Sequence, residues 1–176
     1  AGARAETLPV DPCGAAGIQA YIYGVRAIRL QLLPLGWELS RVGNVEATVN
    51  HDLGIQICFQ NVDRACGIHD PAAISGKGSG SRELIQSGQT ELFAIPGAGD
   101  IHVQGAAPTV WLICVSSDDN TVRAEVSCPE IFEGNQFDGF VKRLFVVDDS
   151  FGPEPEKSDL PHDDFPDFDV QVTKKQ

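Results

Sequence analysis

The feature that most constrains the fold is Thr109–Val115, an almost wholly apolar run of β-forming residues. A run of this length and composition predicts a central strand covered on both faces. It is followed by a turn cluster at 117–120 and by Thr121–Val126, where apolar residues alternate with Arg123 and Glu125. This alternation predicts a half-exposed strand, so we expect the two segments to pair as an antiparallel hairpin.

The clearest helical pattern lies near the N-terminus, after an irregular lead-in at residues 1–14. Between Ala15 and Leu33 apolar residues recur at helical spacing, and Pro34 cannot continue the helix. Gly17 and Gly24 lower its intrinsic stability. Packing against the rest of the domain therefore has to hold this helix.

Short segments of alternating polarity predict the remaining elements. They are strands at 36–40, 45–49, 55–60, 90–95, 101–104 and 140–147, a brief helix at 82–86, and loops at 61–81 and through Pro129, Gly134 and Gly139. Because the helix comes first and the strands follow in series, the predicted class is α+β. We expect an N-terminal helix packed on a mainly antiparallel sheet of about five to seven strands. One domain at 15–147 would carry an irregular acidic tail at 148–176.

The tail is chemically the most distinctive segment. Between Asp148 and Asp169 it holds nine acids and one lysine, in a chain whose net charge is −12. Prolines prevent regular structure through most of it, while phenylalanines between the acids offer apolar anchors. The residues expected to bind a partner are Asp163, Asp164, Phe165, Asp167, Phe168 and Asp169. A partner protein with a basic, apolar-lined groove would fit them; the alternatives are a solubilising tail or one that folds back on its own body.

Amino-acid composition indicates the cellular compartment and the source of the chain. No apolar segment approaches the roughly 20 residues that span a bilayer. The five cysteines are widely spaced, which is typical of free thiols in a reducing compartment. We therefore expect a cytoplasmic protein without membrane contact, and the use of Ala, Gly and Arg with few lysines favours a bacterial or phage source. The mildly acidic body argues against nucleic acid as a general ligand.

One group of residues has the chemistry of a metal site. Cys58, Cys66 and His69 stand as C-x7-C-x2-H. The strands predicted at 45–49 and 55–60 should form a second hairpin, and His51 lies just across it. Four such ligands could hold zinc tetrahedrally. Structural zinc sites usually contain two close ligand pairs, however, and here there is only one. No cofactor is expected, and zinc is kept as a minor alternative.

A second group has the chemistry of an anion site. Glycines in 76–81 let a backbone approach an anion, serines donate hydrogen bonds, and two cations flank them. The weak candidates are Lys77, Ser79, Ser81 and Arg82. Their order is not that of a phosphate-binding P-loop, so hydrolysis of nucleoside triphosphates is not expected.

Motifs of catalysis are incomplete in this sequence. Glu125-Val-Ser127 has serine where a metal-dependent nuclease of the restriction type needs lysine, and no Gly-x-Ser-x-Gly elbow is present. The leading expectation is a non-enzymatic binding or regulatory protein that acts through protein–protein contact, such as an acidic inhibitor or accessory factor. One alternative is a small phosphate-handling or metal-dependent enzyme centred on 51–82, with His51, Asp52, His69, Lys77 and Arg82. Another is a structural subunit of a larger assembly.

Overall fold

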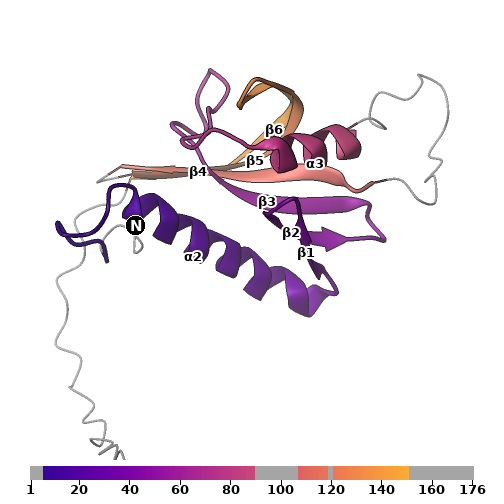
Figure 1. The fold of residues 1–176 in the computed structure, drawn as a ribbon, viewed down its shortest axis with the longest axis horizontal. Helices are drawn as coiled ribbons and strands as arrows, with labels where there is room; N and C mark the ends of the chain where they lie inside the picture. Colours follow the sequence, from indigo (N-terminus) through magenta and orange to yellow (C-terminus); the bar gives the residue numbers. More distant parts are fainter. Residues whose placement is uncertain (1–5, 90–106, 119–120, 151–176) are drawn as a thin grey trace, which may run out of the picture.

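A computed structural model of the chain describes residues 6–89, 107–118 and 121–150. One long N-terminal helix lies against a single six-stranded sheet (Figure 1). The strands follow chain order across the sheet, from β1 at one edge to β6 at the other. The predicted class, α+β with an N-terminal helix on a mainly antiparallel sheet, is confirmed.

The described elements come in the following order. They are α2 (Ala15–Leu32), the 3-10 turn η1 (Leu33–Leu35), β1 (Glu38–Val42), β2 (Val45–Asn50), β3 (Ile55–Asn61), α3 (Ser79–Gln89), β4 (Thr109–Ser117), β5 (Thr121–Glu133) and β6 (Gln136–Ser150). The predicted hairpins β2–β3 and β4–β5 are present and antiparallel. The strands predicted at 90–95 and 101–104 lie outside the described residues.

A parallel pair joins the two halves of the sheet. β3 and β4 run side by side from Ile55↔Thr109 to Asn61↔Val115. Parallel strands need a crossover connection, and α3 lies within it. The predicted helix at 82–86 is therefore the middle of a longer helix, whose amphipathic pattern packs Leu84 and Ile85 into the core.

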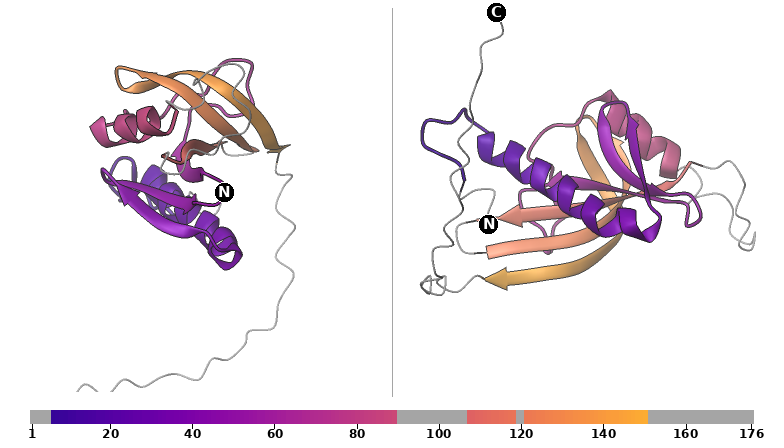
Figure 2. Two further views of the ribbon diagram at one scale, coloured as in Figure 1. Left: turned by 90° about the vertical axis from the view of Figure 1, so that its right-hand side faces the viewer. Right: turned by 90° about the horizontal axis from the view of Figure 1, so that it is seen from below.

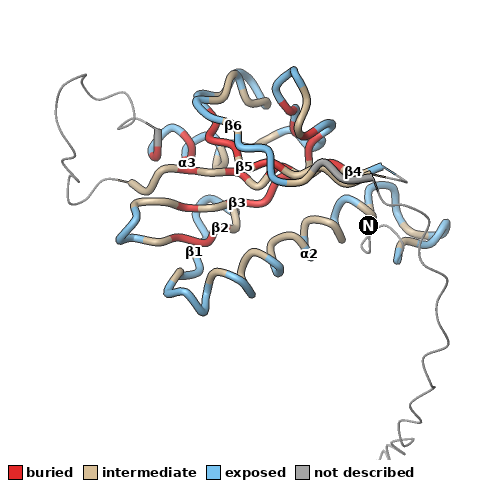
Figure 3. Tube along the Cα trace, turned by 180° about the vertical axis from the view of Figure 1, so that it is seen from behind, coloured by how far each residue is buried: buried red, intermediate tan, exposed pale blue. Residues whose placement is uncertain are grey.

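One face of the sheet carries the core. Cys58 of β3 lies beside Leu112 of β4, and Cys114 lies beside Glu125 of β5, all on this face. α3 and the loop at 62–78 cover it, as the buried stretches in Figure 3 indicate. The buried cluster consists of Ala47, Cys58, Val62, Ala65, Leu84, Ile85, Val110, Leu112 and Cys114.

The opposite face is covered only in part. α2 packs on β2 and β3, where the ring of Tyr21 meets that of Phe59 edge-on with centroids 6.2 Å apart. β4, β5 and β6 extend beyond the helix, as the view from below shows (Figure 2). Along β4 every second residue is buried and the residues between are half-buried. The expectation that this strand is covered on both faces was therefore wrong, because α2 lies over β2 and β3 and not over β4.

The long hairpin β5–β6 replaces the loop predicted through Pro129, Gly134 and Gly139. Two β-bulges, at Ala124/Glu125 and Cys128/Pro129, shift the register between the strands. A bulge lets a proline sit within a paired strand, which is why Pro129 does not end β5. β6 in turn continues three residues past Val147.

The helix α2 is held against the sheet at a close approach. A Cβ on Gly24 would lie 2.3 Å from the ring of Phe59, so only glycine lets the helix come this near. None of the helix residues is fully buried, and Ile18, Ile22 and Leu30 are exposed. Within the described part of the chain, no helix is long and apolar enough to cross a membrane.

Candidate functional site

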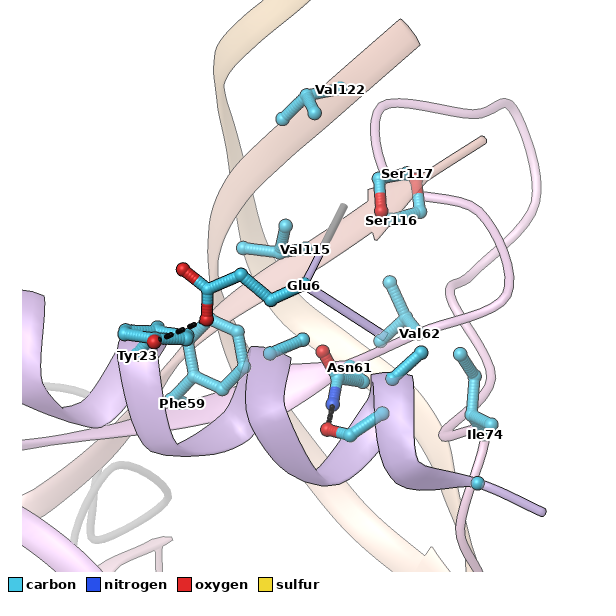
Figure 4. Close-up of a pocket in the computed structure, with 15 residues that line it drawn as sticks. Glu6, Tyr23, Phe59, Asn61, Val62, Ile74, Val115, Ser116, Ser117 and Val122 are labelled. Atoms are coloured by element: carbon cyan, nitrogen blue, oxygen red, sulfur yellow. Dashed lines mark hydrogen bonds between the residues drawn. The ribbon is translucent and has the colours of Figure 1, made fainter. Parts of the chain in front are cut away.

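A cavity of about 580 Å³ separates the N-terminal half of α2 from the sheet, and we call it the α2 cavity. Its floor is apolar and comes from the ends of three strands, with Phe59 from β3, Val115 from β4 and Val122 from β5 (Figure 4). Val62 and Ile74 close it on the side of the loop at 62–78. Segments distant in sequence thus line one concave surface.

The cavity exists because α2 presents small residues to the sheet. Ala16, Ala20 and Gly24 recur every fourth position, and therefore lie on one side of the helix. Gly24 sits directly on Phe59, whereas nothing lies within 4 Å of the Cβ position of Gly17. The helix therefore touches the Phe59 ring closely at Gly24 and leaves open space beside Gly17, two turns earlier.

Polar groups are few and stand at the margin of the cavity. The carboxylate of Glu6 accepts a hydrogen bond of 2.6 Å from the hydroxyl of Tyr23. This hydrogen bond raises the pKa of Tyr23 above its usual value. Asn61 donates through Nδ2 to the carbonyl oxygen of Gly17 at 2.9 Å, which ties the end of β3 to the first turn of α2. The site therefore combines an apolar floor with one carboxylate at its edge.

An apolar surface continues from the cavity across β4, β5 and β6. The register places Ile113, Val126 and Leu144 in one row beside Phe59, on the side of the sheet where α2 lies. The members of this surface, which we call the open face, are Trp111, Ile113, Val115, Val122, Ala124, Val126 and Leu144. Each of them is half-buried or exposed. A row of apolar side chains in contact with water is a common mark of an interaction surface.

A buried ion pair fixes the loop at 62–78 on the core face. Arg143 forms two hydrogen bonds of 2.8 Å to the carboxylate of Glu125, which is wholly buried. The hydroxyl of Ser127 donates to the same carboxylate at 2.7 Å, and the backbone N–H of Cys66 donates at 2.6 Å. Burial alone would raise the pKa of Glu125, but these hydrogen bonds outweigh it and hold the pKa below its usual range.

This ion pair corrects the prediction for β5. The alternation placed Arg123 and Glu125 toward solvent, yet Glu125 is fully buried, as is Ser127 beyond it. The loop at 62–78 covers that side of β5. Arg143 also binds residues of this loop. It donates to the carbonyl oxygen of His69 at 3.1 Å and forms an ion pair of 3.3 Å with Asp70.

The four candidate metal ligands do not form one group. His51 is exposed in the β2–β3 turn, and His69 is exposed in the loop after β3. They lie at opposite edges of the sheet, because His51 is near Glu38 of β1 and the carbonyl oxygen of His69 accepts a hydrogen bond from Arg143 of β6. Cys58 is buried in the core, and the thiol of Cys66 lies against the carbonyl oxygens of Ala124 and Val147. In the described ranges no three His, Cys, Asp or Glu side chains are placed to hold a metal ion.

The anion-site candidates divide into two pairs. Lys77 and Ser81 line a second, smaller cavity together with Cys58. Ser79 and Arg82 are exposed at the start of α3. The enzyme alternative required His51, Asp52, His69, Lys77 and Arg82 in one pocket. The structure instead leaves His51 near Glu38 of β1 and His69 near Arg143 of β6, at opposite edges of the sheet. The tail residues predicted to bind a partner, 163–169, lie outside the described residues.

The sequence held a signal for the α2 cavity that composition-based reasoning does not detect. Gly17 and Gly24 were interpreted only as weak points of a helix, whereas small residues at every fourth position indicate a close or hollow helix–sheet contact. No protein-family model, curated protein or solved structure matches the chain significantly.

Proposed function

We propose that this chain is a non-enzymatic binding or regulatory protein that holds a segment of a partner protein in the α2 cavity and along the open face. The α2 cavity carries the proposal. Its volume of about 580 Å³ lies within the range of roughly 300–1,000 Å³ that is typical of ligand sites. An apolar floor that continues into an open sheet face is longer than a small molecule needs and suits a polypeptide segment.

The charge of the chain indicates the chemistry of the partner. A net charge of −12 repels a second copy and attracts basic proteins. Glu6 places a carboxylate beside the apolar floor. The segment that fits best therefore carries an apolar anchor residue next to Arg or Lys. The acidic, phenylalanine-containing tail would add a second contact with the same basic partner.

Selection from a displayed random-peptide library tests this proposal on the full chain. Ala20→Trp would fill the α2 cavity, because Ala20 lines it. Ala27→Trp adds the same bulk to the exposed side of the same helix and serves as the matched control. We expect enriched peptides to combine an aromatic or aliphatic residue with a basic neighbour. Their affinity should fall at least about tenfold in the Ala20 variant and stay unchanged in the Ala27 variant.

Three outcomes would contradict the proposal. They are a library that yields no cavity-dependent binder, peptides that bind both tryptophan variants equally, and an enriched set that is acidic. Light scattering of the free chain supplies an independent check. A stable oligomer at micromolar concentration would favour the alternative of a structural subunit, since it would bury the open face against another copy.

A further inference from the structure

The second cavity lies where strands β2 and β3 separate. Their pairing runs from Asn50↔Ile55 to Ala47↔Cys58 and goes no further, although both strands continue. The gap beyond Cys58 is closed by Leu84 of α3 and Leu112 of β4 and has a volume of about 190 Å³. We call it the Lys77 cavity, because Lys77 supplies a cation to its otherwise largely apolar wall.

Backbone contacts around Lys77 limit the positions that its side chain can take. Its N–H donates to the carbonyl oxygen of Asn135 in the β5–β6 turn at 3.0 Å. A Cβ on the preceding Gly76 would lie 2.7 Å from the side-chain amide of Asn135, so this contact is close. Lys77 is half-buried and lines the cavity together with Cys58, which lies in the core. The side chain is therefore directed inward from the loop.

The charge of Lys77 has no carboxylate counterpart among the described residues. Glu46 also lines the cavity, but its carboxylate forms ion pairs with Arg29 and Arg41. Burial raises the pKa of Cys58 to about 12 and that of Cys114 to about 12, so neither thiol is ionised at neutral pH. Burial also lowers the pKa of Lys77. An ammonium held among apolar and neutral groups is unfavourable until an anion joins it.

We propose that the Lys77 cavity binds a small organic carboxylate with an apolar body about the size of one ring. The carboxylate would accept hydrogen bonds from the ammonium of Lys77 and the hydroxyl of Ser81, while the body lies against Leu84, Val110 and Leu112. A dry apolar cavity of about 150 Å³ takes up benzene, so the available space fits a single ring. One cation in an apolar wall suits a monoanion better than a strongly hydrated phosphate dianion.

Calorimetric titration of the full chain with benzoate tests this proposal, with benzamide as a neutral ligand of the same shape. Lys77→Met keeps the length of the side chain and removes its charge. Lys142→Met removes a charge from an exposed position on β6 and serves as the matched control. We expect saturable benzoate binding to the native chain and to the Lys142 variant. The Lys77 variant should bind at least about tenfold more weakly, and benzamide should bind the native and Lys77 variants alike.

A second variant tests the space in the Lys77 cavity separately from the charge of Lys77. Leu84→Phe would fill the space and should abolish benzoate binding with Lys77 intact, whereas Ala20→Trp, in the other cavity, should leave it unchanged. The proposal is overturned by any of three results: benzoate does not bind at millimolar concentration, benzamide binds the native chain as well as benzoate does, or the Lys77 variant binds benzoate normally. Far-UV circular dichroism of each variant confirms that the compared chains are folded.

Discussion

At the scale of single residues, Glu125 and Arg143 form the most deeply buried ion pair among the described residues. The two charges are joined by two hydrogen bonds, and the remaining carboxylate positions are filled by Ser127 and the N–H of Cys66. Buried charges are tolerated when every hydrogen-bonding position is used, and they destabilise strongly when a partner is lost. The pair therefore holds the loop at 62–78 on β5 and β6, and with it one wall of the α2 cavity.

We expect Glu125→Gln to lower the free energy of unfolding by about 3–5 kcal/mol, because it leaves the largely buried Arg143 with only the exposed Asp70 as a counter-charge. The double variant Glu125→Leu with Arg143→Met should cost less than the sum of the single changes, since it removes both charges together. Urea denaturation followed by tryptophan fluorescence measures both. Additive losses would show that the pair is not coupled.

The same pair sets a pH dependence whose sign follows from the lowered pKa of Glu125. In the unfolded chain a glutamate titrates near pH ~4.3. The stabilisation is therefore complete above that pH and is lost as the pH falls through the lower pKa of the folded state. In Glu125→Gln this part of the acid-induced loss should be missing, which urea titrations repeated between neutral and acidic pH would reveal.

At the scale of elements, α2 is an 18-residue helix without a fully buried side chain. The close contact between Gly24 and Phe59 is thus a main determinant of its position. Its start and end were predictable, because helical periodicity begins after the lead-in and Pro34 stops it. The closeness of its approach to the sheet was not predictable, because Gly24, which permits the contact, only weakens the helix when it is considered locally.

Two glycine substitutions in α2 should have opposite effects. Gly24→Ala should destabilise the protein by about 1–3 kcal/mol, because the added methyl overlaps the Phe59 ring. Gly17→Ala, in the same helix with free space at its Cβ position, should stabilise by about 0.5–1 kcal/mol through helix propensity. Thermal unfolding monitored by circular dichroism compares the two. Equal shifts of the same sign would mean that α2 does not lie as closely on Phe59 as described.

At the scale of the whole molecule, sequence periodicity predicted most strands and the hairpins β2–β3 and β4–β5, but not the sheet order. Alternation of apolar and polar residues identifies β2, β3 and β5 in the sequence. The parallel pairing of β3 with β4 joins residues about 50 positions apart, and nothing local specifies it. The candidate site was missed for the same reason. Its floor comes from Phe59, Val115 and Val122, which become neighbours only when that pairing forms.

The parallel pairing of β3 with β4 also divides the chain into two halves that are each locally paired. Residues 6–89 contain α2, β1, β2, β3 and α3, whereas 107–150 contain β4, β5 and β6. A chain cut within 90–106 should therefore behave as a split protein. We expect its two fragments, expressed separately, to reassemble when mixed, with the reassembled fraction rising with concentration.

Each fragment carries one tryptophan, Trp37 in the first and Trp111 in the second. Complementation can thus be followed from both sides by fluorescence, and a mixture whose spectrum equals the sum of its parts would contradict it. Reassembly would make the α2 cavity a composite of two polypeptides, because α2 and Phe59 belong to one fragment and Val115 and Val122 to the other. A peptide that binds the mixture of the two fragments, but neither fragment by itself, would then report their reassembly.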